Sequence, residues 1–159
     1  LETRFNDSQG TKLAIGEVAA ELVKFMNDDP ERSYKVTIGT DSELFNKTSA
    51  DFVTAIVVHR RGNGGRYFWS RVELRNFYTI RDRILKEVLT SLDIAKETLA
   101  YLKQLDAPRF DLEIHVDVGV NGESSKMIQE LVGMIRANNF EAKTKPESYA
   151  ASSVADRHL

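Results

Sequence analysis

Apolar residues recur at helical spacing near the start of the chain and at strand spacing after it. Residues 11–27 have one apolar side at a period of 3.6, which predicts a helix ending at the Asp-Asp-Pro sequence 28–30. Alternation with a period of two then predicts strands over residues 34–41, 51–60 and 66–74. The glycine-rich turn 62–65 joins the last two strands, so we expect them to form a β-hairpin.

The second half of the chain alternates between helical and strand patterns. Apolar residues at helical spacing predict a long helix over 79–105, and Pro108 lies beyond its end. Residues 110–117 read FDLEIHVD, which predicts a further strand. We expect a helix after the Gly-Asn-Gly turn that follows, then a short strand over 140–144 and a last helix from Ser148. This order predicts an α/β fold with a five-stranded mixed sheet, an antiparallel meander plus parallel strands, flanked by helices.

The composition narrows the chemistry that the protein can use. With 159 residues, 42% of them hydrophobic, the chain is long enough for one domain with a full core. It has no cysteine and three histidines, which excludes thiolate sites and argues against a histidine-rich zinc centre. Any metal would be held mainly by oxygen, which favours Mg²⁺ or Mn²⁺. No apolar run is long enough for a membrane span, and a cytoplasmic location is expected.

Two of the predicted strands end with an aspartate, Asp41 and Asp117. If these strands are parallel neighbours, their carboxyl ends meet at one edge of the sheet, where open α/β sheets tend to bind ligands. Two carboxylates placed that close repel each other unless a proton or a cation lies between them, and a magnesium ion would meet this need. The pattern alone fits equally well with aspartates that serve as turn or helix-cap residues.

Three longer segments carry a resemblance to a known family. They are IGTDSE at Ile38–Glu43, HVDVGVNGESSKMIQELVGMI at His115–Ile135 and AKTKPESYAASSVADRH at Ala142–His158. These segments resemble motifs of the YkuK-type family of uncharacterised bacterial proteins in the ribonuclease H-like superfamily. The resemblance implies a ribonuclease H-like domain over residues 34–159, preceded by an N-terminal helical extension over residues 1–33.

The resemblance also implies which acids hold the metal. Nucleases of this superfamily carry an acid on the first strand and another at the end of the fourth, and these positions match Asp41 and Asp117. A third acid comes from the first core helix. Only the first turns of the helix over 79–105 can approach a strand-end site, because a helix rises about 1.5 Å per residue. Glu87 is therefore matched to this position, with Asp82 as the alternative.

A fourth acid or histidine in these nucleases comes from the last helix, and Asp156 is matched to it, with His158 nearby. Asp156 also fits a serine-capped helix start. The resemblance thus implies a nuclease that hydrolyses phosphodiester bonds of RNA, DNA or a hybrid with Mg²⁺ or Mn²⁺. The alternative is a catalytically inactive domain of the same fold that binds nucleic acid or a protein partner. A nucleotide phosphotransferase related to actin-like ATPases is a third hypothesis, but those enzymes use two such domains.

Basic residues indicate where nucleic acid would bind. From Arg60 to Arg83 the chain has seven arginines and two acids, a local charge that would attract a polyanion, although it also fits a solvated hairpin and helix start. The residues expected to contact phosphate are Arg60, Arg61, Arg66, Lys126 and Lys145. The aromatic residues expected to contact bases, or else to pack on the sheet, are Tyr67, Trp69 and Phe77.

Overall fold

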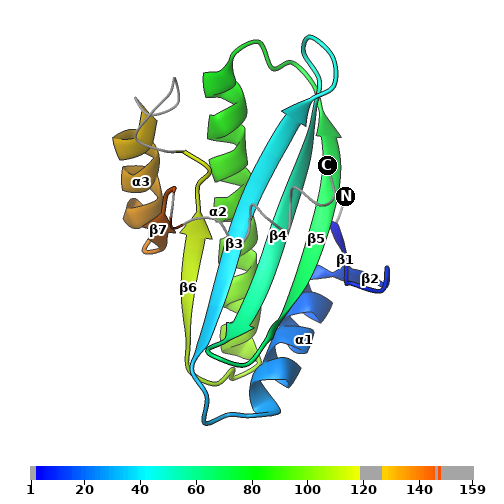
Figure 1. Ribbon diagram of the computed structural model, residues 1–159, viewed down its shortest axis with the longest axis vertical. Helices are drawn as coiled ribbons and strands as arrows, with labels where there is room; N and C mark the ends of the chain where they lie inside the picture. Colours follow the sequence, from blue (N-terminus) through cyan, green and yellow to red (C-terminus); the bar gives the residue numbers. More distant parts are fainter. Residues whose placement is uncertain (1–2, 119–126, 146, 148–159) are drawn as a thin grey trace.

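A computed structural model describes residues 3–118, 127–145 and 147 (Figure 1). In this part of the chain the elements are, in order, β1 (Arg4–Asn6), β2 (Lys12–Ala14), α1 (Ile15–Asn27), β3 (Tyr34–Leu44), β4 (Ala50–Arg60), β5 (Gly65–Leu74), α2 (Ile80–Gln104), β6 (Phe110–His115), α3 (Ile128–Ala137) and β7 (Glu141–Lys143). The long helix expected over 79–105 is confirmed, with Thr79 as its N-cap. The last helix, expected from Ser148, lies outside the described residues.

The strands form one mixed sheet in the order β2-β1-β5-β4-β3-β6-β7. The antiparallel meander β3-β4-β5 and the parallel additions β6 and β7 confirm the expected core arrangement. The expected number of five strands is wrong, because β1 and β2 add two more to the edge at β5. Three-residue strands between polar turns leave too little alternation for a sequence pattern to reveal them.

The hairpin of β1 and β2 also corrects the start of the first helix. The Asp7 carboxylate accepts hydrogen bonds from the backbone N–H groups of Gln9 and Thr11, both at 2.9 Å, and Gly10 takes a positive φ of 84°. This turn pairs Lys12–Ala14 with β1, so the helix expected over 11–27 begins at Ile15 instead. The Glu17 side chain accepts from the Ala14 N–H at 2.9 Å and so supports the new helix start.

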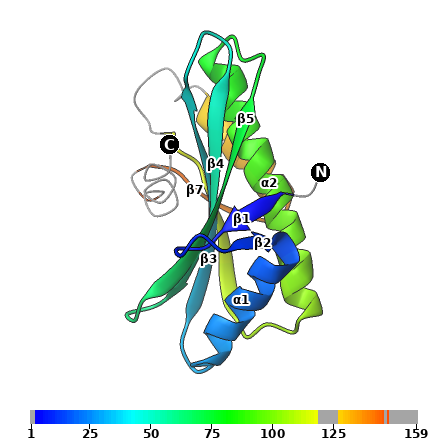
Figure 2. The same cartoon turned by 90° about the vertical axis from the view of Figure 1, so that its right-hand side faces the viewer.

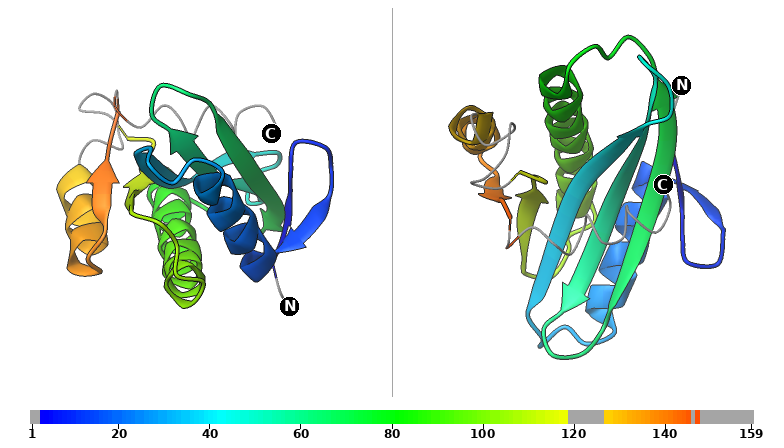
Figure 3. Two further views of the ribbon diagram at one scale, coloured as in Figure 1. Left: turned by 90° about the horizontal axis from the view of Figure 1, so that it is seen from below. Right: turned by 45° about the horizontal axis from the view of Figure 1, so that its top comes forward.

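The helices α1, α2 and α3 cover one face of the sheet (Figures 2 and 3). Within the described ranges no helix lies on the other face, and no helix is long and apolar enough to cross a membrane. The core lies between this helical layer and the sheet. Its fully buried side chains include Val18, Leu22, Met26, Val36, Ile38, Ile56, Phe68, Leu102, Ile114, Leu131 and Ile135.

The central strand β3 is longer than the sequence pattern indicates. It was expected to end at Asp41, but it pairs with β4 without a break from Tyr34↔Arg60 to Leu44↔Ala50. On its other side β6 ends at His115, short of the expected strand end at Asp117. Asp41 therefore lies inside β3, at a level where that strand has lost its parallel neighbour.

Burial of Phe5 joins residues 1–33 to the main core, since this side chain on β1 is fully buried among residues of the later elements. We predict that Phe5→Ala lowers the free energy of unfolding by about 3–5 kcal/mol in one cooperative transition, as truncation of a buried phenylalanine does. Urea unfolding followed by circular dichroism would measure this. The exposed Gln9→Ala in the same hairpin should change it little. Two separate transitions would instead mean that residues 1–33 fold independently.

Candidate metal centre

The parallel pairing of β3 with β6 brings two of the expected acids to one edge of the sheet. Gly39 pairs with His115, and two further residues along each chain lead to Asp41 and Asp117. Figure 1 shows β6 ending part-way along β3, at this level. Asp41 is half-buried and its Oδ1 accepts the Ser42 backbone N–H at 2.9 Å, while the Asp117 side chain is 24% exposed. Both carboxylates therefore lie at the edge where β6 ends.

Glu87 approaches the same edge from α2. It is the eighth residue of this helix, so it lies roughly 10 Å along the axis from the helix start. Its side chain is only 7% exposed, and its Oε2 accepts a hydrogen bond from the Ser42 hydroxyl at 2.5 Å. The alternative helix acid, Asp82, is exposed in the first turn, where its backbone N–H donates to the Thr79 hydroxyl.

Both aspartates act electrostatically on Glu87. The pKa of Glu87 is raised from 4.5 to about 8, mainly by burial and also by the negative charges of Asp41 and Asp117. The hydrogen bond from Ser42 and the positive charge of Arg83 oppose this rise in pKa. Glu87 is therefore protonated at neutral pH in the absence of a cation.

A buried hydroxyl network fixes α2 against β3 beside these acids. Thr40 Oγ1 is 3.0 Å from Thr54 Oγ1 on β4 and 2.8 Å from Ser91 Oγ on α2. Ser91 lies one helical turn beyond Glu87, so the network holds the helix at the height where Glu87 meets Ser42. Arg83, one turn before Glu87, donates to the Ser42 carbonyl at 3.4 Å.

A lysine provides a positive charge at the same edge. Lys145 Nζ lies 2.8 Å from Asp117 Oδ1, and the Lys145 backbone N–H donates to the Val118 carbonyl at 2.9 Å. The lysine side chain is 57% exposed, so an ion pair of this kind is worth about 1 kcal/mol or less and exchanges readily. Lys145 was expected to contact phosphate, and it lies beside one of the acids expected to bind metal.

The donor set fits a hard divalent cation. Asp41, Glu87 and Asp117 offer only oxygen ligands, which Mg²⁺ and Mn²⁺ accept together with water and phosphate. Among the residues that the structure describes, however, no three acidic or histidine side chains converge closely enough to hold an ion in common. His115, on the neighbouring strand, is buried and its Nε2 donates to Glu113 at 3.2 Å.

The remaining residues expected to bind metal or nucleic acid fall into two groups. Asp156, Lys126 and His158 lie outside the described residues. The expected basic patch is divided, because Arg60 pairs with Tyr34, seven residues and about 23 Å before Asp41 along β3. At that distant end the three arginines are engaged with other groups: Arg60 with the Phe25 carbonyl and ring, Arg61 with Asp111, and Arg66 with Glu21.

Sequence reasoning missed Ser42 and Arg83. Alternation along β3 already places Ser42 and Asp41 on opposite faces of the sheet, and Ser42 is on the face that the helices cover. A polar side chain on that face was a usable sign that Ser42 has a polar partner. Arg83 precedes Glu87 by four residues, the spacing that brings two helical side chains to the same side. Neither signal reveals that Ser42 donates to the Glu87 carboxyl group or that Arg83 donates to the Ser42 carbonyl.

Comparison with known proteins identifies the class. Residues 17–159 match the family model described as Ribonuclease H-like, and the chain belongs to that family. Among curated proteins, it is similar to the uncharacterized protein YkuK of Bacillus subtilis strain 168, with 30% identity over 167 residues that cover 96% of this chain and 95% of the relative. No solved structure gives a significant match. The resemblance to the YkuK-type family is therefore confirmed.

The raised pKa of Glu87 predicts how stability depends on pH. Its folded-state pKa of about 8 lies above the unfolded value of 4.5, so its contribution is fully present below pH 4.5 and is lost as the pH rises through 8. In metal-free buffer, we expect Glu87→Gln to match the wild type near pH 5 and to exceed its unfolding free energy by about 2–4 kcal/mol at pH 9. Urea unfolding across this range would measure the difference.

The matched control for this prediction is Glu97→Gln, which makes the same change at an exposed position of the same helix. It should leave the pH profile of the wild type unchanged. Parallel profiles for the wild type and Glu87→Gln would contradict the assignment of a buried, protonated Glu87.

Proposed function

We propose that this protein is a nuclease that hydrolyses phosphodiester bonds with Mg²⁺ or Mn²⁺ held by Asp41, Glu87 and Asp117. The observation that supports this most directly is the burial of Glu87 within electrostatic reach of both aspartates. Three carboxyl groups gathered at one sheet edge repel one another when ionised, and a divalent cation would relieve that repulsion. The ribonuclease H-like family is consistent with nuclease chemistry at this edge.

The protein's own residues would divide the work at this edge. Asp41 and Asp117 would hold the cation, and Glu87 would join them after losing its proton. Bound there, the ion would supply an activated water and stabilise the leaving oxygen of the phosphodiester. Ser42 holds the Glu87 carboxyl toward β3. Lys145 would leave Asp117 and pair with a substrate phosphate, for which an exposed lysine is well suited.

Metal binding should stabilise the fold through these residues. We predict that Mn²⁺ at about 100 times its dissociation constant raises the unfolding free energy of the wild type by about 2.7 kcal/mol. At a fixed Mn²⁺ concentration the gain should be larger at pH 8 than at pH 6, because Glu87 must release its proton to bind the ion. Asp117→Asn should abolish most of the gain in a thermal unfolding assay. An equal gain in Asp117→Asn would place the metal elsewhere.

Cleavage of labelled nucleic acid tests the activity itself. We predict that the wild type cleaves at least one of RNA, DNA and hybrid substrates in Mn²⁺ or Mg²⁺. Asp41→Asn and Asp117→Asn should each lower the rate at least about 100-fold, because each removes a charged metal ligand. Asp93→Asn, an exposed acid on α2, is the matched control and should retain full activity. Cleavage that survives both site substitutions would contradict the proposal.

A non-catalytic nucleic-acid-binding domain is the second candidate. It is favoured by the Lys145 ammonium, which already neutralises Asp117 at 2.8 Å. Such a domain would bind nucleic acid without cleaving it. Its affinity would be insensitive to Mg²⁺ but would fall steeply with salt, because phosphate contacts release counterions. The cleavage and salt measurements together distinguish the two candidates.

A further inference from the structure

Exposed apolar side chains gather at the end of the sheet where α2 begins. They come from the end of β3 and its turn toward β4, and from the connection between β5 and α2 (Figure 1). The four side chains, which we call the aromatic rim, are Leu44, Phe45, Tyr78 and Ile80, with exposed fractions of 44%, 50%, 73% and 42%. Single exposed apolar residues are ordinary, but a group on two adjoining segments indicates a binding surface.

The two segments of the aromatic rim are held together by the fold. The Phe77 backbone N–H donates to the Thr48 carbonyl at 2.9 Å, and the rings of Phe52 and Phe77 lie 5.1 Å apart. Phe77, for which the sequence left base contact and packing on the sheet as alternatives, thus packs against Phe52. Phe45 and Tyr78 belong to the same two segments and remain exposed, so their rings are not needed to close the core.

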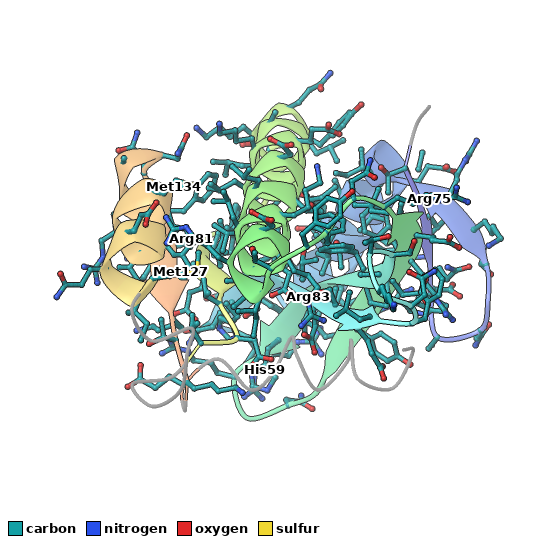
Figure 4. The ribbon with its side chains drawn as sticks, turned by 90° about the horizontal axis from the view of Figure 1, so that it is seen from above. His59, Arg75, Arg81, Arg83, Met127 and Met134 are labelled. Atoms are coloured by element: carbon teal, nitrogen blue, oxygen red, sulfur yellow. The ribbon has the colours of Figure 1, made fainter. Side chains whose placement is uncertain are left out.

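Basic residues lie on the same segments as the aromatic rim. Arg75 is 78% exposed and its Nε is 3.9 Å from Glu73, a weak surface pair, and Lys47 lies in the turn after β3. Arg83 lies in the first turns of α2, and Figure 4, which looks onto this end of the sheet, labels Arg75 and Arg83 there. Exposed aromatics beside arginines fit nucleic acid, since rings stack on bases while guanidinium groups bind phosphate.

The aromatic rim continues directly into the candidate metal centre. Phe45 is four residues beyond Asp41, just after β3 ends at Leu44, so extended chain of about 13 Å or less separates the two residues. Arg83 precedes Glu87 by one helical turn. It donates to the carbonyl of Ser42, the residue that follows Asp41 on β3. A strand bound on the rim would therefore pass next to the carboxylates.

We propose that Phe45 and Tyr78 stack on unpaired bases of a single-stranded nucleic acid, with Arg75 and Arg83 on its phosphates, so that the strand is delivered to the edge holding Asp41 and Asp117. The delivery step rests on the proposed nuclease function. Single strands are selected because bases in a duplex already stack on one another and offer no free face to a protein ring. The substrate class of the centre is then single-stranded nucleic acid or a single-stranded end.

Binding in the absence of metal tests this separately from hydrolysis. The probe is fluorescein-labelled oligothymidylate of about 12 nucleotides, compared with a duplex of equal length, by fluorescence anisotropy in EDTA. The wild type should prefer the single strand. Phe45→Leu and Tyr78→Leu should each weaken its binding about tenfold with little effect on the duplex, because leucine keeps the apolar surface and removes the ring. Arg75→Gln should reduce the salt dependence.

The matched control is Tyr101→Leu, which removes an aromatic ring that is 38% exposed near the far end of α2. It should bind like the wild type, and circular dichroism would verify that every variant is folded. Equal binding of the single strand by wild type, Phe45→Leu and Tyr78→Leu would overturn the inference, and so would a wild-type preference for duplex. A wild-type dimer that the leucine variants dissociate would assign the rim to a second copy of the chain.

The two proposals fail in distinguishable ways. Ring-dependent binding of oligothymidylate without metal-dependent cleavage would reject the nuclease and keep the single-strand surface. Cleavage that depends on Asp41 and Asp117 but not on Phe45 or Tyr78 would keep the nuclease and reject the surface.

Discussion

Three carboxyl groups within electrostatic reach of one another repel when all are ionised, and the edge where β6 ends has to resolve that repulsion. Without a metal, a proton and an ammonium group relieve this repulsion. A proton stays on Glu87, whose pKa is raised to about 8, and the ammonium of Lys145 lies 2.8 Å from Asp117. Each of these charges is one that a divalent cation would replace. This is the charge balance that the proposed metal ion would take over.

Unequal strand lengths create this edge. β3 pairs with β4 along all of its length from Tyr34 to Leu44, while its pairing with β6 stops at Gly39 and His115. The remaining part of β3 is still hydrogen-bonded to β4 along one edge, while its other edge has no pairing with β6. Asp41 is held by regular strand geometry, yet its carboxylate lies where the parallel neighbour has ended. Such rigid support is what a metal ligand needs, since small displacements weaken a site.

The sequence was sufficient for most of the fold and for the central acids, and it failed where information is not local. Alternation predicted the meander and β6, and helical spacing predicted α2 to within a residue at each end. The β1–β2 hairpin was missed because three-residue strands have no clear period. Glu87 was chosen from its position along α2, but its burial and its bond to Ser42 depend on how α2 packs on β3. Counting charges along a hairpin also ignores that its two ends lie far apart, so it did not show that Arg60, Arg61 and Arg66 lie at the end distant from Asp41.

The same reasoning explains why the exposed aromatics lie where they do. The proposed metal centre on β3 and α2 lies a few residues from the β3–β4 turn and from the start of α2, and the helical layer covers one face of the sheet there. Side chains in these two segments would therefore contact a polymer that approaches from this end of the sheet. Phe77 and Phe52 pack against each other and close the core below. Phe45 and Tyr78 stay exposed on two adjoining segments, which is the arrangement expected of a binding surface. In the two proposals taken together, recognition of the substrate would depend on Phe45, just after the end of β3, and chemistry on it would depend on Asp41, four residues earlier within the strand.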